Sequence, residues 1–323
     1  MDFPFKKALV TGGAGFVGSH IVEKLVKMGV ETISIDNYFS GKQKNLEHLN
    51  GYPNFQEVKC DITDSKSLDK YFPGIEVVFH QAVSKKIICL KDPRMDLKIN
   101  AEATFNLLEL AVKHKVKKFV HASTGSVYGE AQISPQDENH PLVPTSYYGV
   151  SKLAGEKYIK VFEHLYELDT TILRYFHVYG PRQESSKEGG VVSIFIRLML
   201  ESKPITIFGD GTQQRSFTFV EDVVKANLLA ASNPNTKGEI FNCASGIKVS
   251  INELAETIAG ILNIKNQKMI YEDWMPGDIK IFDIDNSRIV KKLGIEFLTD
   301  IKKGLSLTID WAEKFFLKGE TGV

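Results

Sequence analysis

A tyrosine and a lysine four residues apart, Tyr148 and Lys152, are the residues in this chain best suited to acid–base chemistry. On a helix they share one face. A phenol with a pKa near 10 is a poor base at neutral pH, but a neighbouring ammonium group favours the phenolate. The hydroxyl of Thr124 follows an apolar run and could bond to the same substrate oxygen. The three residues predict a device that removes a proton from an alcohol while a hydride leaves its carbon.

A glycine-rich turn near the N-terminus predicts where that hydride goes. Gly12, Gly15 and Gly18 follow the first apolar run. A tight turn, a close approach of the backbone to a pyrophosphate and a close helix contact each favour glycine. The helix expected over residues 16–28 would direct its N–H groups at the phosphates. Asp36 lies roughly 20 residues further on, where a carboxylate binds an adenosine ribose, and it favours NAD over NADP.

Composition limits the class of protein. The 323 residues carry forty Lys+Arg against forty Asp+Glu, so nothing suggests a nucleic acid or an anionic membrane as partner. The three cysteines, Cys60, Cys89 and Cys243, are widely spaced, fit no metal-ligand pattern and favour a reducing compartment. We expect Cys60 and Cys243 in the core and Cys89 partly buried. The N-terminus resembles no signal peptide, and no apolar stretch reaches about 18 residues, so we expect a cytoplasmic protein.

Strand and helix patterns alternate along the first half of the chain. Apolar runs predict strands near residues 8–10, 32–35, 55–60, 77–80, 118–122 and 171–175. Helical patterns lie between them, at 100–114 and 147–165 among others, and Ser65 could cap a short helix ending at Tyr71. This order predicts an α/β fold with a doubly wound parallel sheet of the Rossmann type. Ligands bind beyond the carboxyl ends of such strands, which is where Asp36, Asp61, His80-Gln81 and Ser123-Thr124 fall.

The second half is less regular and predicts a smaller lobe. Helical patterns at 191–201, 251–262 and 305–316 surround short apolar runs at 205–208 and 238–244. We expect an NAD-binding domain of residues 1–175 plus about 217–244. Residues of about 176–216 plus 245–323 would form a discontinuous C-terminal lobe that binds the substrate.

Taken together, these motifs resemble the extended short-chain dehydrogenase/reductases, in the nucleotide-sugar epimerase/dehydratase family, most of all its UDP-glucose and UDP-N-acetylglucosamine 4-epimerases. The matching stretches run from Leu9 almost to the C-terminus. They are residues 11–18, Asp61-Ile62, the region of Asn100, and residues 123–129, 148–152, 174–182 and 209–222.

The resemblance implies a role for each matching residue. The catalytic triad would be Thr124, Tyr148 and Lys152. NAD would be held by Gly12, Gly15, Phe16, Val17, Gly18, Asp36, Asn37, Asp61, Ile62, Gln81, Lys85, Asn100, Ser123, Tyr148, Lys152 and Tyr175. A UDP-linked sugar would contact Lys85, Thr124, Ser126, His177, Val191, Phe208, Arg215, Asp278 and Phe282. Two chains would pair through residues 100–114 and 147–165 as a homodimer.

The residues after the catalytic hydroxyl bear on the reaction. The family's 4,6-dehydratases carry an Asp-Glu pair there, whereas this chain has Gly125 and Ser126, which cannot do acid–base work. The resemblance therefore favours C4 epimerisation through a transient 4-keto sugar, with NAD retained. A 4,6- or 5,6-dehydratase and a 4-ketoreductase remain the alternatives within the family. The alternative that is not an enzyme is a non-catalytic NAD-binding protein on the same fold, and the intact triad argues against it.

Three departures from the family pattern concern the substrate. His177 replaces the usual Asn, Met275 replaces an Arg that binds phosphate, and the loop from Lys85 to Cys89 is unusual. Lys86 or Cys89 could supply a proton in a 5,6-dehydration, although a structural thiol is the simpler interpretation of Cys89. Phe282 matches a position where a bulky side chain favours UDP-glucose and UDP-galactose over 2-acetamido sugars.

Overall fold

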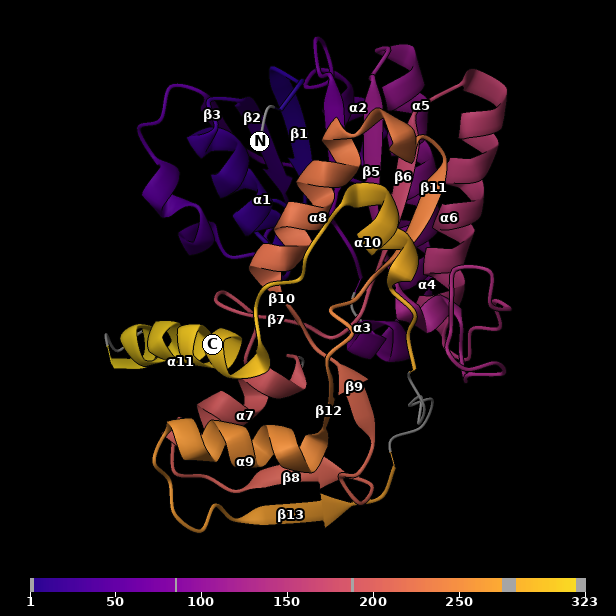
Figure 1. Cartoon of the computed structure of the whole chain (residues 1–323). Coiled ribbons are helices and arrows are strands. Elements are labelled where there is room, and N and C mark those ends of the chain that lie inside the picture. Colours follow the sequence, from indigo (N-terminus) through magenta and orange to yellow (C-terminus); the bar gives the residue numbers. More distant parts are fainter. Residues whose placement is uncertain (1–2, 85, 187–188, 275–282, 318–323) are drawn as a thin grey trace.

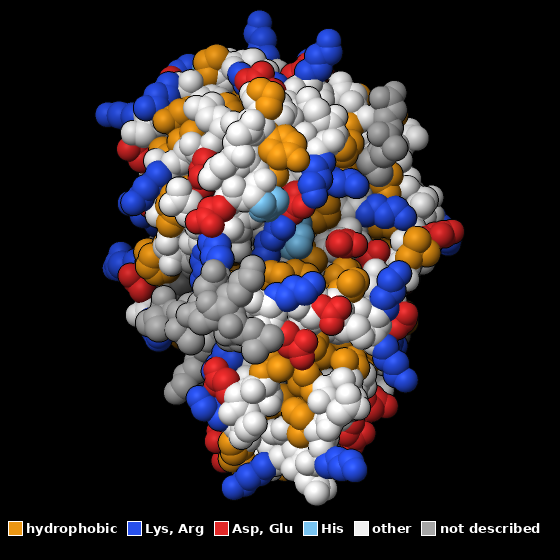
Figure 2. Space-filling view, turned by 90° about the vertical axis from the view of Figure 1, so that its left-hand side faces the viewer, with side chains coloured by type: hydrophobic (Ala, Val, Ile, Leu, Met, Phe, Trp, Pro, Cys, Tyr) orange, Lys and Arg blue, Asp and Glu red, His pale blue; other side chains and the backbone are white. Residues whose placement is uncertain are grey.

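The computed structural model describes residues 3–84, 86–186, 189–274 and 283–317. Figure 1 shows a sheet flanked by helices and, below it, a smaller part built from the second half of the chain. On the face in Figure 2, acidic and basic side chains are interspersed, in keeping with equal numbers of the two charges. None of the described helices is both long and apolar enough to cross a membrane.

Within the described residues, the central sheet has seven parallel strands, which confirms the predicted doubly wound fold. The chain starts in the middle with β1, builds β2 and β3 on one side, and then crosses to β4 on the other. That reversal leaves a crevice beyond the carboxyl ends of β1 and β4. In spatial order the strands are β11 (Glu239–Cys243), β6 (Thr170–Tyr175), β5 (Lys118–Thr124), β4 (Val77–His80), β1 (Lys7–Thr11), β2 (Glu31–Asp36) and β3 (Phe55–Lys59).

Helices cover both faces of this sheet. Ala8 and Val10 of β1 point to one face and Leu9 to the other, because side chains alternate along a strand. The first face packs against α1 (Phe16–Lys27), α8 (Val220–Ser232) and α10 (Ser287–Leu293). The second face packs against α2 (Ser65–Asp69), α5 (Ala103–Lys113) and α6 (Tyr147–Tyr166). The short elements α3 (Lys86–Lys91), α4 (Pro93–Leu97) and the π-helical turn η3 (Lys98–Glu102) precede α5.

The second half of the chain forms a separate apolar cluster, in the lower part of Figure 1. Val192 and Phe195 of α7 pack there with Leu254 and Ile258 of α9. The strands β8 and β13 pair in parallel, and β9 and β12 pair antiparallel. The elements are β7 (Val178–Tyr179), α7 (Val191–Leu200), β8 (Ile205–Phe208), β9 (Gln214–Ser216), β10 (Thr218–Phe219), β12 (Lys248–Ser250), α9 (Ile251–Ile261), β13 (Met269–Glu272) and α11 (Ile301–Leu317).

Contacts between the two parts fasten α1 to the segment that follows β7. Arg182 forms an ion pair with Glu23, and the ring of His20 donates to the carbonyl of Pro181 at 3.0 Å. The chain later returns to the sheet at α10, whose Ile289 packs in the same cluster as β1. The predicted domain division stays a prediction. Because α11 packs again in the lower cluster, the excursion to α10 adds two crossings between the parts to those that the division assumed.

Several local predictions were wrong. Asp64, not Ser65, caps α2 by accepting from the N–H of Ser67, and the helix ends at Asp69. The helix predicted from Asn100 begins instead as the π-helical turn η3. Cys60 is only half-buried and Cys89 is fully buried, whereas Cys243 is buried as predicted. The elements α3, α4, α8, α10 and β13 were not predicted.

Candidate active site

Three side chains predicted to do the chemistry meet at the carboxyl end of β5. Thr124 is the last residue of that strand, and Tyr148 and Lys152 lie one turn apart on α6, which begins after the N-cap Ser146. The phenol of Tyr148 is hydrogen-bonded to Thr124. The hydroxyl of Thr124 also accepts from the N–H of Ser126 at 3.1 Å. The hydroxyls of Thr124 and Tyr148 therefore point into one space.

Burial works against charge on both members of the Tyr–Lys pair. It raises the pKa of Tyr148 to about 12, with the charge of Asp96 and the thiol of Cys89 adding to the rise and the bond from Thr124 opposing it. Burial also lowers the pKa of Lys152 to about 7, against the opposing effects of Glu156 and Asp96. The phenol thus needs a nearby positive charge before it can act as a base at neutral pH.

Asn100 braces the start of α6. Its side-chain Nδ2 donates to Asp96 at 2.9 Å and to the hydroxyl of Ser151 at 3.1 Å, and its side-chain Oδ1 accepts from the N–H of Ser84 at 2.9 Å. Ser151 in turn donates to the carbonyl of Tyr148 at 3.1 Å. The residue predicted to touch the cofactor therefore ties η3 to the turn that carries the catalytic tyrosine.

Polar side chains also lie behind the catalytic residues, on the α6 side of the sheet. Thr11, His80 and His121 lie side by side on β1, β4 and β5, and we call them the polar row. Nδ1 of His80 contacts the hydroxyl of Thr11 at 2.7 Å and its Nε2 contacts that of Thr104 at 2.9 Å. Nε2 of His121 lies 3.2 Å from Nζ of Lys152.

The glycine turn forms a cradle that fits a pyrophosphate. Gly12 has a φ of 65°, and a Cβ on Gly18 would lie only 2.1 Å from the carbonyl oxygen of Gly12, so larger residues are excluded. Within the described residues, the N-cap Gly15 leaves the N-terminus of α1 without a side-chain cap. The N–H groups of the first turn, at Phe16 and Val17, can therefore serve an anion.

The carboxylate of Asp36 is held at the end of β2 beside this cradle. It accepts from the N–H groups of Ala14 at 3.0 Å and Tyr38 at 2.8 Å, and both its oxygens keep further acceptor capacity. Asn37 donates to Asp61 at 2.9 Å, next to Ile62. The residues present therefore fit the adenosine end of NAD.

Two of the residues predicted to contact NAD, Ser123 and Tyr175, have hydroxyl groups that bond to other protein groups. The hydroxyl of Ser123 donates to Glu156 at 2.5 Å. The hydroxyl of Tyr175 lies between Gln81 and Asn227, at 3.1 Å from Oε1 of the first and 3.0 Å from Oδ1 of the second. These hydrogen bonds therefore connect the carboxyl ends of β5 and β6 to the helices α6 and α8.

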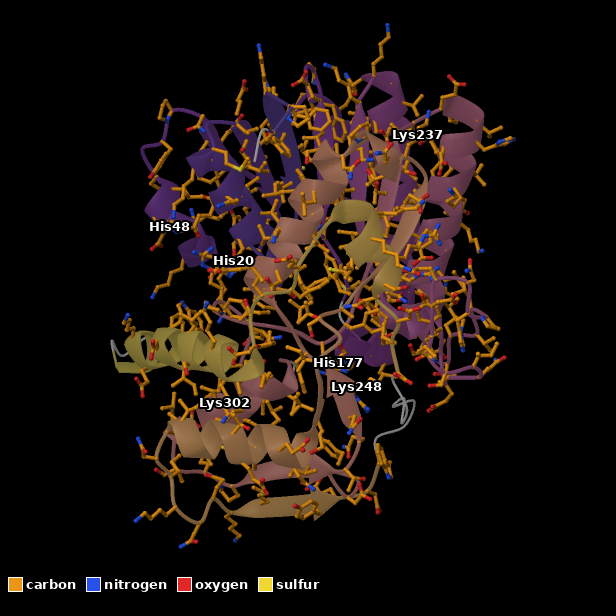
Figure 3. The ribbon with its side chains drawn as sticks, viewed as in Figure 1. His20, His48, His177, Lys237, Lys248 and Lys302 are labelled. Atoms are coloured by element: carbon orange, nitrogen blue, oxygen red, sulfur yellow. The ribbon has the colours of Figure 1, made fainter. Side chains whose placement is uncertain are left out.

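The predicted substrate residues come from the second half of the chain. Val191 starts α7, Phe208 ends β8, and Arg215 is buried on β9, where its Nη1 donates to the carbonyl of Gln214 at 2.9 Å. Figure 3 shows His177 between the sheet and the lower part. Its φ of 38° is in a region that Asn and His enter more readily than most residues, which explains how His can replace the usual Asn. Lys85, Met275, Asp278 and Phe282 lie outside the described residues.

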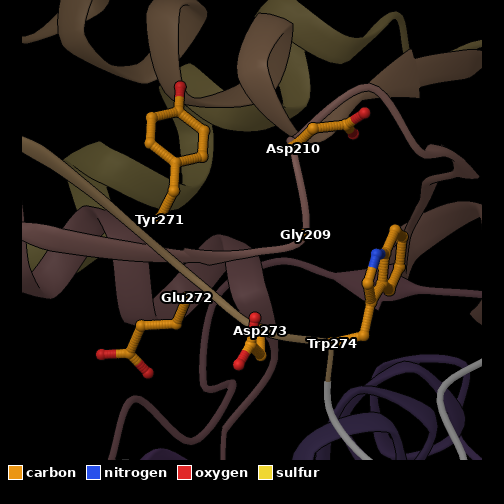
Figure 4. A pocket seen from close by; sticks show the side chains of 6 residues that line it. All are labelled: Gly209, Asp210, Tyr271, Glu272, Asp273 and Trp274. Carbon is orange, nitrogen blue, oxygen red and sulfur yellow. The ribbon is translucent and has the colours of Figure 1, made fainter.

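An open pocket adjoins Phe208 in the lower part. Figure 4 shows its lining, where Trp274 faces Gly209. A Cβ on Gly209, whose φ is 78°, would lie 2.6 Å from the indole ring. The remaining lining residues are Asp210, Tyr271, Glu272 and Asp273. The pocket next to Phe208, a residue predicted to contact the nucleotide, is therefore lined by aromatic and acidic side chains.

Sequence reasoning missed the supporting residues Asp96, His121, Glu156 and Asn227. Asn227 is fully buried on α8 and also donates to the carbonyl of Val223 at 2.8 Å. A polar residue within an otherwise apolar helical stripe could have indicated it, but α8 itself was not predicted. The others became visible only through their partners on distant elements.

Comparisons with known proteins agree with this geometry. The chain is 41% identical to a protein of Methanocaldococcus jannaschii, provisionally named a UDP-glucose 4-epimerase, over 94% of this chain and 97% of that one. The Thermotoga maritima UDP-glucose 4-epimerase, solved with UDP-glucose, has a TM-score of 0.91 at 37% identity and covers 96% of this chain and 99% of its own. The UDP-N-acetylglucosamine 4-epimerase of Methanobrevibacter ruminantium, solved with UDP-N-acetylmuramic acid, matches with the same TM-score and coverage at 34% identity.

The profile of the NAD dependent epimerase/dehydratase family matches residues 8–244, which include the glycine cradle and the Thr–Tyr–Lys site. The cofactor is therefore NAD. The chain belongs to the NAD dependent epimerase/dehydratase family.

Proposed function

We propose that this protein interconverts the C4 epimers of a UDP-hexose or UDP-N-acetylhexosamine, through a transient 4-keto sugar and with NAD retained. Its similarity to UDP-sugar 4-epimerases over nearly the whole chain supports this reaction class. The three free cysteines and the two nucleotide ligands are consistent with action in the cytoplasm.

The observation that carries the choice of reaction is the lack of space at Gly125. A Cβ built there would lie 2.2 Å from Cε1 of Phe176, so an acidic side chain at this position would require the ring to move. The family's 4,6-dehydratases place an acid directly after the catalytic hydroxyl. Ser126 follows, and its hydroxyl lies 3.3 Å from that of Thr124. Neither position after the catalytic hydroxyl therefore supplies an acid, which favours proton transfer by the triad and suits an epimerase.

In the proposed mechanism, Tyr148 takes the proton of the sugar 4-OH while Thr124 donates a hydrogen bond to the same oxygen. NAD held in the glycine cradle would supply the hydride acceptor for C4 and would return the hydride to the opposite face of the 4-keto sugar. Tyr148 then returns the proton to the alkoxide. Lys152 keeps a positive charge beside the phenol and binds the cofactor ribose, which offsets the effect of burial on the pKa of Tyr148.

The substrate must turn over between the two hydride transfers while its nucleotide stays in place. We propose that Arg215 holds the diphosphate, since a planar guanidinium bonds two phosphate oxygens at once. Phe208 and Val191 would line the base, and His177 and Ser126 would face the sugar. The roles of Lys85, Asp278 and Phe282 remain those implied by the resemblance.

We also propose that two chains form a homodimer through α5 and α6. One side of α6 carries large apolar side chains at helical spacing, and these are 42% to 62% exposed on the single chain. Such a stripe on a single chain indicates a contact surface. Its members are Tyr147, Val150, Tyr158, Val161 and Leu165.

The activity is tested by NMR on the purified chain without added cofactor. UDP-glucose and UDP-N-acetylglucosamine are supplied separately, and the galacto epimer of one or both should appear at catalytic turnover. The Tyr148→Phe variant is the matched control and should turn over about a thousandfold more slowly. A 4-keto-6-deoxy or unsaturated sugar, or stoichiometric release of reduced cofactor, would contradict the proposal.

The dimer is tested separately by sedimentation. Val161→Glu places a charge in the α6 stripe and should shift the chain towards the monomer. Leu298→Glu is the control, because Leu298 is 67% exposed and lies outside α5 and α6. An unchanged association state of the Val161 variant would exclude this surface.

A further inference from the structure

The surroundings of Lys152 contain a group that the proposed mechanism does not use. Its ammonium nitrogen lies 3.2 Å from Nε2 of His121, and both side chains are buried. Acids on α4 and α6, Asp96 and Glu156, act on the lysine only through their charge. His121 reaches it from the middle of β5, across the interface between sheet and helix.

The chemistry of the contact fixes the state of the imidazole. A charged lysine can only donate, so Nε2 of His121 must accept and Nδ1 must carry the ring proton. Nδ1 is buried and has no hydrogen-bond partner within the described part of the chain. An unpaired buried N–H destabilises a fold. Stability alone therefore gives no reason for a histidine here.

The neighbouring histidine makes the contrast clear. His80 lies beside His121, with ring centroids 5.0 Å apart, and both its nitrogens have partners. Thr104 already donates to the carbonyl of Asn100 at 2.7 Å, so Nε2 of His80 donates to Thr104 and Nδ1 accepts from Thr11. Both ring nitrogens of His80 are hydrogen-bonded, so this residue links structural elements. The hydrogen-bonded nitrogen of His121, Nε2, accepts from the catalytic lysine.

We infer that His121 is a positioning residue for Lys152: its neutral imidazole holds the ammonium group in place and helps to keep it charged beside Tyr148. This inference rests on the proposed function. A neutral acceptor stabilises the charged form of its donor, so His121 opposes the effect of burial on the lysine. Burial and the charge of Lys152 hold the pKa of His121 well below its usual range, so the ring stays an acceptor.

The titratable groups around Lys152 together determine the pH at which its ammonium group loses a proton. Tyr148 and Glu156 come from α6, Asp96 from α4 and His121 from β5, with His80 behind it on β4. Removing the acceptor leaves the two carboxylates unchanged and should let the ammonium lose its proton at lower pH. The alkaline limb of the pH–rate profile should therefore shift to lower pH.

Two substitutions at His121 separate the roles of shape and acceptor. His121→Phe keeps a ring and removes the acceptor, and His121→Gln keeps an oxygen that can accept. Phe119→Leu, two residues earlier on the same face of β5, is the control for a packing change. NMR of carbon-13-labelled lysine follows the titration of Lys152, whose signal is identified by its absence in Lys152→Met.

The titration midpoint should fall by about one pH unit in His121→Phe, and should stay near the original value in His121→Gln and Phe119→Leu. The kcat of the Phe variant should fall about tenfold with little change in the KM for the sugar nucleotide, and Gln should restore most of it. An unchanged midpoint in a folded His121→Phe chain, or equal loss in the Gln variant, would overturn the inference. The titration needs no substrate, so its outcome is independent of whether the protein epimerises UDP-sugars.

Discussion

Two neighbouring rows of side chains on one face of the sheet have opposite characters. Leu9, Val78 and Phe119 form what we call the apolar row across β1, β4 and β5. The polar row lies two residues further along the same strands. All six side chains are buried to a similar degree, and the same layer of helices covers both rows.

The difference shows how stability and chemistry are divided along a strand. Buried apolar side chains stabilise the fold without needing specific partners, at roughly 25 cal/mol per Å² of apolar area. Buried polar groups stabilise it little, and each costs free energy unless it is paired. The row nearer the carboxyl edge is polar and connects the sheet to Thr104 and to Lys152 of the candidate site, while the row behind it holds the sheet to its helices.

The largest expected effect comes from replacing the lysine beside the polar row. Lys152→Met should reduce turnover about a thousandfold and at the same time stabilise the chain by roughly 1–3 kcal/mol at neutral pH. The pKa of Lys152 is lowered to about 7 in the fold, so the unfolded chain binds its proton more readily. The resulting destabilisation is fully present below pH 7 and disappears as the pH rises towards 10.5, the usual value.

Urea unfolding without NAD measures that gain, and the gain should shrink as the pH rises. A Lys152→Met chain less stable than the original at pH 7 would show that the lysine is also a stabilising contact. The contrast between stabilising apolar groups and costly buried polar groups would then not extend to the lysine beside the polar row.

After the loss of turnover in Lys152→Met, the largest effect should be the loss of stability when the buried ion pair between Glu156 and Arg174 is broken. The carboxylate accepts from Nη2 at 2.7 Å, from Nε at 3.0 Å and from Ser123. The Glu156 bonds and charge outweigh burial and raise the pKa of Arg174. Glu156→Gln leaves a buried guanidinium without its counterion and should cost about 3–5 kcal/mol in unfolding free energy.

The double variant Glu156→Gln, Arg174→Met removes both charges and should be more stable than Glu156→Gln alone. Unfolding in urea compares the two directly. Equal stabilities would show that the unpaired charge is not what destabilises the single variant.

A smaller effect is expected at Thr104, which accepts from His80 in the polar row. Thr104→Val keeps the shape of the side chain but leaves Nε2–H of His80 without its acceptor. The chain should lose about 1–2 kcal/mol of stability. Thermal melting of the NAD-bound protein measures this, and a melting temperature equal to the original would show that the histidine finds another partner.

The smallest effect is expected in the apolar row. Phe119→Leu should lower the unfolding free energy by about 1 kcal/mol and leave kcat and its pH dependence unchanged. A loss of turnover at constant stability would mean that the apolar row also positions the site, and the division between the rows would not hold.

The sequence alone determined the parts that depend on local chemistry. The spacing of Gly12, Gly15 and Gly18 predicted the turn at the end of β1, and alternation of strand and helix patterns predicted the parallel sheet. The four-residue spacing of Tyr148 and Lys152 places both on one face of α6 whatever the rest of the fold does. Such features involve residues close together in the chain, so their geometry can be read directly.

Only the tertiary structure decided which distant residues surround that pair. His80 and His121 become neighbours because β4 and β5 pair in one particular register, which no local pattern specifies. Phe176 closes the space at Gly125 in the same way, from the end of β6. Strand register and helix packing result from the summed burial of the whole core. The groups that tune the lysine and limit the reaction therefore emerge only when the chain is folded.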